Sequence, residues 1–227
     1  MKKKNKRRKS FLLQILLLMG LAVFSLFCIR DMKKEFEKVP AESHSVLPDE
    51  WYLILVNYKH PIPENYVPEL TVLDNGRSVD SRIYPALQQM FDDMRAEKIY
   101  PVVGEGYRTA AEQHQMMEEK VEAYINDGFT RKRAEALAEN EVAAVGKSEH
   151  QLGLAVDINA DKSLSDNEDV YGWLAENAYK YGFILRYPAD KTAVTGIDFE
   201  PWHYRYVGEE AAKEIYDLGI CLEEYLE

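Results

Sequence analysis

Between residues 148 and 157 the chain reads Ser148-Glu149-His150-Gln151-Leu152-Gly153-Leu154-Ala155-Val156-Asp157. The apolar and polar residues that alternate over residues 154–159 predict a strand that contains Asp157. Gly153 lets the chain turn before this strand, so that the side chains of His150 and Asp157 can reach one point. A carboxylate among apolar strand residues is costly unless it pairs or binds a cation. This stretch therefore predicts a sheet that carries a metal site.

A second segment, Glu200-Pro201-Trp202-His203, leads into another predicted strand at residues 202–207. Catalytic zinc takes three protein ligands, from imidazole nitrogen and carboxylate oxygen, and keeps a fourth position for water. His203 would supply the third ligand of such a site. Glu200, three residues earlier, would then face the zinc-bound water and accept its proton. We expect Trp202 to pack behind the site.

These two motifs resemble those of a known family, the VanY-type zinc D-alanyl-D-alanine carboxypeptidases, which are related to VanX-like dipeptidases and share the Hedgehog fold. The family pattern Ser-x-His-x-x-Gly-x-Ala-x-Asp, followed later by Glu-x-x-His, matches both segments without a departure. Two further motifs agree, Gly106-Tyr107-Arg108-Thr109 with Gln113 behind it, and Leu55-Val56-Asn57 with a proline-rich continuation. The resemblance covers about residues 50–220.

The resemblance implies that His150, Asp157 and His203 bind zinc, and that Glu200 is the general base and then the general acid. It also implies a zinc-dependent D,D-carboxypeptidase, which hydrolyses the terminal D-Ala-D-Ala bond of peptidoglycan stem peptides by a Glu-activated zinc-bound water. The partners implied are stem peptides that end in D-Ala.

The resemblance further implies that Arg108, with Ser148 and Gln113, would hold the terminal carboxylate of the substrate. A guanidinium suits this task because it grips a carboxylate through two parallel, charge-assisted hydrogen bonds. The alternatives with the same zinc site are an L,D-carboxypeptidase or a peptidoglycan endopeptidase. A cell-wall lytic enzyme of phage type is a separate alternative, which an uncleaved membrane anchor disfavours. Another alternative is a non-catalytic zinc-containing binding module, which would need neither Glu200 nor Arg108.

The remaining pattern predicts an α+β fold, a small antiparallel sheet flanked by helices, because helices and short strands mix without a regular βαβ rhythm. The expected strands are 51–56, 99–103, 154–159, 183–187 and 202–207. The expected helices are 81–96, 109–125, 131–144, 170–181 and 209–218. Thr109 and Glu112 form a predicted capping box at the start of the second helix.

Residues 11–29 are an apolar run in which only Gln14 and Ser25 are clearly polar, and seven Lys or Arg residues precede it. A helix of this length spans roughly 28 Å, close to the ~30 Å hydrocarbon core of a bilayer. The positive charges that precede the helix are expected to keep the N-terminus in the cytoplasm. No small-x-small cleavage site follows, so we expect an uncleaved anchor. The predicted organisation is a basic cytoplasmic tail (1–10), a transmembrane helix (11–29), a linker (30–49) and an extracytoplasmic zinc carboxypeptidase domain (50–227) on a single-pass cell-membrane protein.

Charge and composition exclude several classes of protein. The 227 residues carry a net charge of −11, although the first 30 contain eight basic residues and no acidic one. The acidic body should repel phosphate backbones, so we expect no nucleic-acid partner. A hydrophobic fraction of 46% excludes a disordered chain.

The two cysteines are not expected to form a disulfide. Cys28 lies in the predicted membrane helix, whereas Cys221 lies near the C-terminus.

Overall fold

The computed structural model describes residues 50–227. The predicted cytoplasmic tail, the transmembrane helix at 11–29 and the linker lie outside the described residues. Among residues 50–227, no helix is both long enough and apolar enough to cross a membrane.

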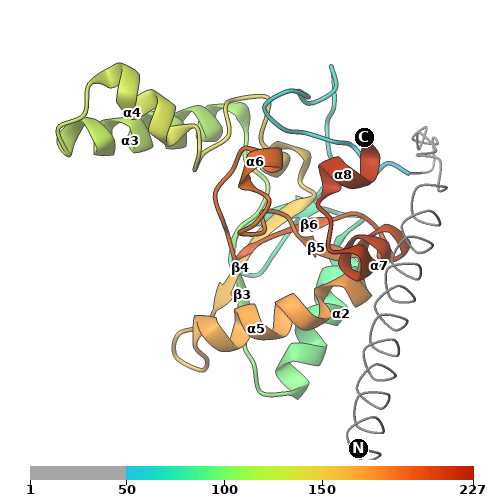
Figure 1. The fold of residues 1–227 in the computed structure, drawn as a ribbon. Helices are drawn as coiled ribbons and strands as arrows, with labels where there is room; N and C mark the ends of the chain where they lie inside the picture. Colours follow the sequence, from blue (N-terminus) through green and yellow to red (C-terminus); the bar gives the residue numbers. More distant parts are fainter. Residues whose placement is uncertain (1–49) are drawn as a thin grey trace, which may run out of the picture. The chain divides into compact units, whose positions relative to one another are not determined.

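The described part has an α+β fold built on antiparallel sheets with helices around them (Figure 1). Its strands are β1 Leu70–Val72, β2 Ser78–Asp80, β3 Pro101–Glu105, β4 Ala155–Ala160, β5 Phe183–Leu185 and β6 His203–Tyr206. Its α-helices are α2 Tyr84–Ala96, α3 Ala110–Asn126, α4 Arg131–Ala138, α5 Asn167–Asn177, α6 Thr192–Thr195, α7 Glu209–Leu218 and α8 Leu222–Leu226. Two 3₁₀ turns, η1 Glu149–Leu152 and η2 Ala178–Tyr181, complete the set. The predicted α+β class is confirmed.

The larger sheet has the strand order β3-β4-β6-β5, and every neighbouring pair is antiparallel. Helices α2 and α5 cover one face of this sheet (Figure 1). Val156, Ile158 and Tyr204 point to that face and join the main hydrophobic core. Successive strand residues alternate between the two faces. Asp157 and His203 therefore lie on the opposite face, where the register pairs them directly.

Helices α3 and α4 form a hairpin that extends away from the sheet (Figure 1) and packs around its own small apolar cluster. The capping box of Thr109 and Glu112 is present at the start of α3, as the sequence predicted. Helix α4 ends at Ala138, six residues before the predicted end at residue 144. Beyond the helix, the Asn140 carbonyl accepts a 3.0 Å hydrogen bond from the Asp198 backbone N–H, in a loop distant in sequence.

The prediction of a strand at residues 51–56 is wrong. Leu53 and Val56 are buried as expected, but the backbone of the segment is irregular. The Tyr52 and Ile54 carbonyls accept hydrogen bonds of 2.8 and 2.9 Å from the Arg205 guanidinium, which takes the place of a neighbouring strand. The short hairpin β1–β2 and helices α6 and α8 were not predicted, although Asn75-Gly76 is a turn signal between the two hairpin strands.

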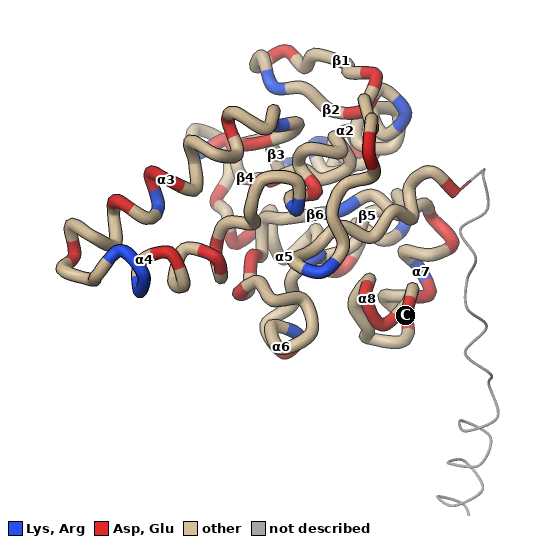
Figure 2. Tube along the Cα trace, turned by 90° about the horizontal axis from the view of Figure 1, so that it is seen from above, with Lys and Arg blue, Asp and Glu red and all other residues tan. Residues whose placement is uncertain are grey.

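Acidic residues are spread along the described chain, and Figure 2 marks their positions in α3, α7 and α8. A surface of this sign attracts cations and repels polyanions. The expectation that the chain has no nucleic-acid partner rests on this charge and stays a prediction.

Candidate metal centre

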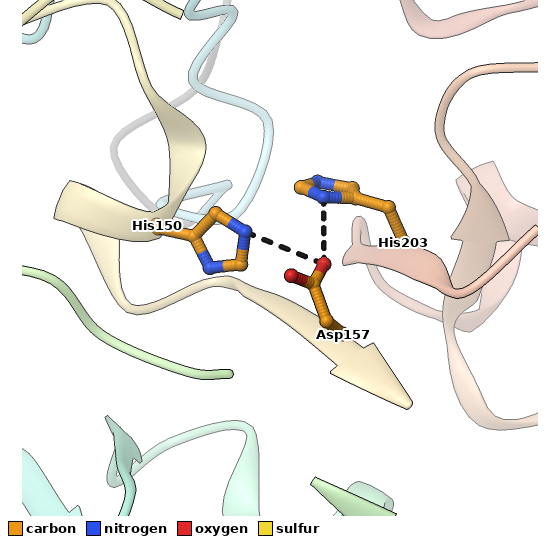
Figure 3. Close-up of side chains that lie close together, drawn as sticks. All are labelled: His150, Asp157 and His203. Carbon is orange, nitrogen blue, oxygen red and sulfur yellow. Dashed lines mark ion pairs between the residues drawn. The ribbon is translucent and has the colours of Figure 1, made fainter. Parts of the chain in front are cut away.

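Three side chains from three elements converge on one point (Figure 3). His150 comes from η1, Asp157 from β4 and His203 from the first position of β6, and their ligand atoms all lie within 4.8 Å of one another. Asp157 Oδ1 lies 3.0 Å from His203 Nδ1 and 3.4 Å from His150 Nε2. The cluster forms because the β4–β6 register places Asp157 opposite His203, and Gly153 turns the chain between His150 and β4.

His150 is oriented by a backbone carbonyl. Its Nδ1 lies 2.7 Å from the Gly106 oxygen, so this nitrogen donates its proton and Nε2 is left to face the cluster. Only glycine fits at position 106, because a Cβ atom there would lie 2.3 Å from the Ser78 carbonyl oxygen. The glycine that begins the Gly106-Tyr107-Arg108-Thr109 motif thus places a hydrogen-bond acceptor behind a candidate metal ligand.

The cluster fits a divalent cation. Burial raises the pKa of Asp157, but the nearby His150 and His203 outweigh it and hold that pKa well below its usual range. Burial lowers the pKa of His203, but the Asp157 and Glu149 carboxylates raise it to about 9. Asp157 Oδ1 is buried and makes no well-aligned hydrogen bond within residues 50–227. Two imidazoles and one carboxylate form a donor set that is typical of catalytic zinc.

Glu200 lies beside the cluster and not within it. Its Oε2 is 3.5 Å from His203 Nδ1. The turn before β6 fixes its position, since the His203 backbone N–H donates to the Glu200 carbonyl at 3.1 Å. Burial and the Asp157 charge raise the pKa of Glu200 to about 7, against the opposing charges of His203 and Arg108. A carboxylate with this pKa can take up or release a proton near neutral pH.

Arg108 points into the same cavity, which has a volume of about 170 Å³. The residue is 8% exposed, and its Nη2 lies 3.7 Å from Asp157 Oδ2. Nη1 donates a 2.8 Å hydrogen bond to Gln113 Oε1, whereas Nε is buried without a hydrogen-bond partner in the described part of the chain. The guanidinium therefore retains donor capacity for an anionic ligand in the cavity.

Gln113 and Ser148 occupy different places around Arg108. Both polar atoms of the fully buried Gln113 amide are engaged, because Oε1 accepts from Arg108 and Nε2 donates to the Ala143 carbonyl at 2.6 Å. This arrangement fixes the guanidinium. Ser148 is buried and lines the cavity. Direct contact of these two residues with a substrate carboxylate stays a prediction.

Sequence reasoning missed two residues at the site. Glu149 is fully buried beside His203, with its Oε2 3.8 Å from His203 Nε2. Tyr187 lines the cavity, and its ring centroid lies 4.8 Å from that of His203. Glu149 occupies an unspecified position between Ser148 and His150 in the motif, and Tyr187 lies in a predicted strand. Nothing in the sequence pattern marks either residue as part of a site.

A candidate cation site of two histidines and an aspartate, with the buried Glu200 carboxylate beside it, is the arrangement of a metal-dependent hydrolase. The family model for VanY, described as D-alanyl-D-alanine carboxypeptidase, matches residues 76–209. The chain belongs to this family.

Relatives of known sequence and structure agree with this assignment. A D-alanyl-D-alanine carboxypeptidase from Enterococcus faecalis is 58% identical over 177 residues, which are 78% of this chain and 66% of the relative. The chain spans about two thirds of the length of this protein and of a Bacillus subtilis relative.

Solved structures are similar over the same region. One is a variant of the vancomycin-resistance D,D-pentapeptidase VanY from a VanB-type cassette, in complex with Zn(II), with 57% identity and a TM-score of 0.77 over 78% of this chain and 100% of the other. VanYB in complex with D-alanine-D-alanine has 58% identity and a TM-score of 0.77 over 78% and 98%. A more distant match is the LD-carboxypeptidase LdcB, with 35% identity and a TM-score of 0.65 over 79% and 87%.

Proposed function

We propose that the chain is a zinc-dependent D,D-carboxypeptidase that hydrolyses the terminal D-Ala-D-Ala bond of peptidoglycan stem peptides. One observation carries the proposal: a single cavity holds the His150–Asp157–His203 cluster, the Glu200 carboxylate and the Arg108 guanidinium. The 58% identical relative that was solved with D-alanine-D-alanine supports this choice of substrate.

Each residue has a separate task in the hydrolysis. His150, Asp157 and His203 would hold a zinc ion, and this ion would act as a Lewis acid that polarises the scissile carbonyl and lowers the pKa of water. Glu200 takes one proton from the attacking water as the water oxygen bonds to the scissile carbonyl carbon. Glu200 then returns that proton to the leaving amine nitrogen as the C–N bond breaks.

Arg108 decides which end of a peptide can enter. A carboxypeptidase must recognise a free terminal carboxylate, and Arg108 supplies a buried, charged donor group for it. Gln113 holds the guanidinium in place through the 2.8 Å hydrogen bond to Nη1. An endopeptidase would gain nothing from a carboxylate-binding residue at this position.

Stem peptides of different lengths test the proposed function. The full-length chain, loaded with zinc, is incubated with a pentapeptide stem, a tetrapeptide stem and the C-terminal amide of each, and the released products are identified by mass. Release of D-Ala from the pentapeptide acid alone is expected. Cleavage of the tetrapeptide acid would instead establish the L,D-carboxypeptidase activity, which the likeness to LdcB favours as the second candidate. Equal cleavage of acids and amides would refute both.

We propose in addition that residues 11–29 anchor the protein in the cell membrane, with the catalytic domain outside. The support is the sequence alone, an apolar run of bilayer length behind seven positive charges. The mature protein should fractionate with membranes and retain its basic N-terminus. A mature N-terminus near residue 30, found by sequencing the purified protein, would show that this segment is a cleaved signal peptide.

A further inference from the structure

Four charged side chains form a buried cluster that reaches His203 through Glu149, and the proposed mechanism uses none of them. They come from separate parts of the chain: η1, the residue after β5, β6 and α8. They are Glu149, Arg186, Arg205 and Glu223, and each is at most 3% exposed. Two positive and two negative charges balance, which is the condition under which charges are tolerated in a protein interior.

Arg186 and Arg205 hold one oxygen of Glu149 in place. Arg186 Nε donates a 2.8 Å hydrogen bond to Glu149 Oε1, and Arg205 Nη1 lies 2.9 Å from the same oxygen. Arg186 is itself fixed by two hydrogen bonds of 2.8 and 2.7 Å to the Glu223 carboxylate, which also accepts from Asn57 at 3.0 Å. Because two cations hold Oε1, the carboxylate cannot rotate. The second oxygen, Oε2, therefore faces away from the two arginines.

That second oxygen faces a candidate zinc ligand. Glu149 Oε2 and His203 Nε2 lie 3.8 Å apart, and both are buried without a hydrogen-bond partner in the described region. The other ring nitrogen of His203, Nδ1, lies 3.0 Å from Asp157 Oδ1, on the side of the metal cluster. A neutral imidazole carries one proton, and the nitrogen that binds a metal must be the one without it.

We propose that Glu149 is a positioning residue for His203, whose carboxylate keeps the imidazole proton on Nε2 and leaves Nδ1 free for the metal. The proposal rests on the proposed function only for the identity of the metal. Carboxylates that accept a proton from a ligating histidine fix its tautomer and orientation and raise its basicity. Hydrogen bonds from Arg186 and Asn57 to Glu223 connect the cluster to α8 and to the segment that precedes the sheet, and these bonds serve the stability of the fold.

Glu149→Gln tests the assignment because an amide keeps the size of the side chain and changes one oxygen to a donor group. The two arginines require the amide oxygen, so the NH₂ group must face His203 Nε2. Two donors cannot pair, and His203 is driven to carry its proton on Nδ1, the atom needed by the metal. The zinc affinity of the full-length chain, measured by competition with a chelator, should fall about 10- to 100-fold.

Glu223→Gln is the matched control, because it removes a charge from the same buried cluster without contact to His203. It should lower the stability of the fold but leave zinc affinity within about threefold of wild type. Equal losses of zinc affinity in the two variants would mean that the cluster acts only by supporting the fold, and would overturn the proposal. Wild-type affinity in Glu149→Gln would overturn it as well.

A measurement on the wild-type chain decides the matter even if Glu149→Gln does not fold. With ¹⁵N-labelled histidine, NMR of the zinc-loaded protein should show His203 protonated on Nε2, with a proton that exchanges slowly with water. Protonation of His203 on Nδ1 would refute the role of Glu149. If the wild-type chain bound no zinc at all, the proposed function itself would fail, and the two outcomes are thereby separated.

Discussion

The surroundings of Glu200 suit a residue that transfers protons during catalysis. Glu200 lies 3.5 Å from one candidate ligand without belonging to the cluster, and burial raises its pKa to about 7. Glu200→Gln is nearly isosteric and cannot transfer a proton, so kcat should fall by roughly 10²–10⁴. Zinc content, measured by atomic absorption, should stay at the wild-type level. A fully active variant would contradict the mechanism.

The same carboxylate predicts how activity depends on pH. Glu200 must be deprotonated to accept a proton from water, so kcat/KM should rise with pH as this group ionises. The pKa of about 7 belongs to the protein without a cation, and a bound cation lowers the pKa of a neighbouring carboxylate. The acidic limb of the kcat/KM profile should therefore lie at or below pH 7. A limb well above pH 7 would mean that another group limits the reaction.

Arg108 should act on binding more than on the chemical step. Arg108→Ala removes the charged donor for the substrate carboxylate, and a hydrogen bond to a charged group is worth about 1.5–3 kcal/mol, so kcat/KM should fall roughly 10- to 100-fold. Most of this loss should be in KM. The ratio of kcat/KM for a peptide acid to kcat/KM for its C-terminal amide should fall as well. Arg131→Ala, in an exposed ion-pair cluster on the α3–α4 hairpin, is the control and should keep wild-type kinetics.

At the scale of elements, a helix or strand was predicted correctly where the residues that determine it lie within the same segment of sequence. Helix α7 has the predicted bounds, because its apolar period and flanking glycines lie within the segment itself. The capping box at Thr109 is local too. Residues 51–56 carry the composition of a strand, but a guanidinium from position 205 satisfies two of their carbonyls, and no local pattern announces such a partner. Glu149 was missed for the same reason, since its partners lie in β6 and directly after β5.

The glycine between β3 and α3 tests how elements position a ligand. In Gly106→Ala the new Cβ would lie 2.3 Å from the Ser78 carbonyl oxygen, which is backbone and cannot yield cheaply. Overpacking of this kind costs about 1–3 kcal/mol. The Gly106 carbonyl, which holds His150 Nδ1 at 2.7 Å, should also shift, so both thermal stability and zinc affinity should fall.

Gly172→Ala is the matched control for this substitution. Gly172 lies within α5, and a Cβ there meets nothing within 4 Å, so the change should stabilise the protein by about 0.5–1 kcal/mol without effect on zinc. A Gly106→Ala variant that behaved like this control would show that the close approach to Ser78 does not hold His150 in place.

At the scale of the whole molecule, Glu223 in α8 is bound both to Arg186, directly after β5, and to Asn57, in the segment that precedes the sheet. Asn57, Arg186 and Glu223 are connected by hydrogen bonds across 166 positions of the chain. Burial raises the pKa of Glu223, but the Arg186 charge and hydrogen bonds outweigh it and hold that pKa below its usual value. The connection between the two ends of the domain therefore depends on an ionised carboxylate.

This dependence predicts how the domain responds to acid. A carboxyl group whose pKa is lower in the folded state contributes stability that is fully present above its unfolded pKa, about 4.3, and is lost as pH falls through its folded pKa. With a chelator present, so that loss of zinc plays no part, the urea midpoint of the full-length chain should fall steadily below about pH 4.5.

Glu223→Gln should be less stable at pH 7, by about 3 kcal/mol, because Arg186 loses its charged partner. Its midpoint should also depend less on pH between 5 and 3 than that of wild type, whereas Glu210→Gln, on the exposed side of α7, should follow wild type. An equal acid response in Glu223→Gln and wild type would assign the loss of stability to other carboxylates and leave the two ends of the domain joined by packing alone.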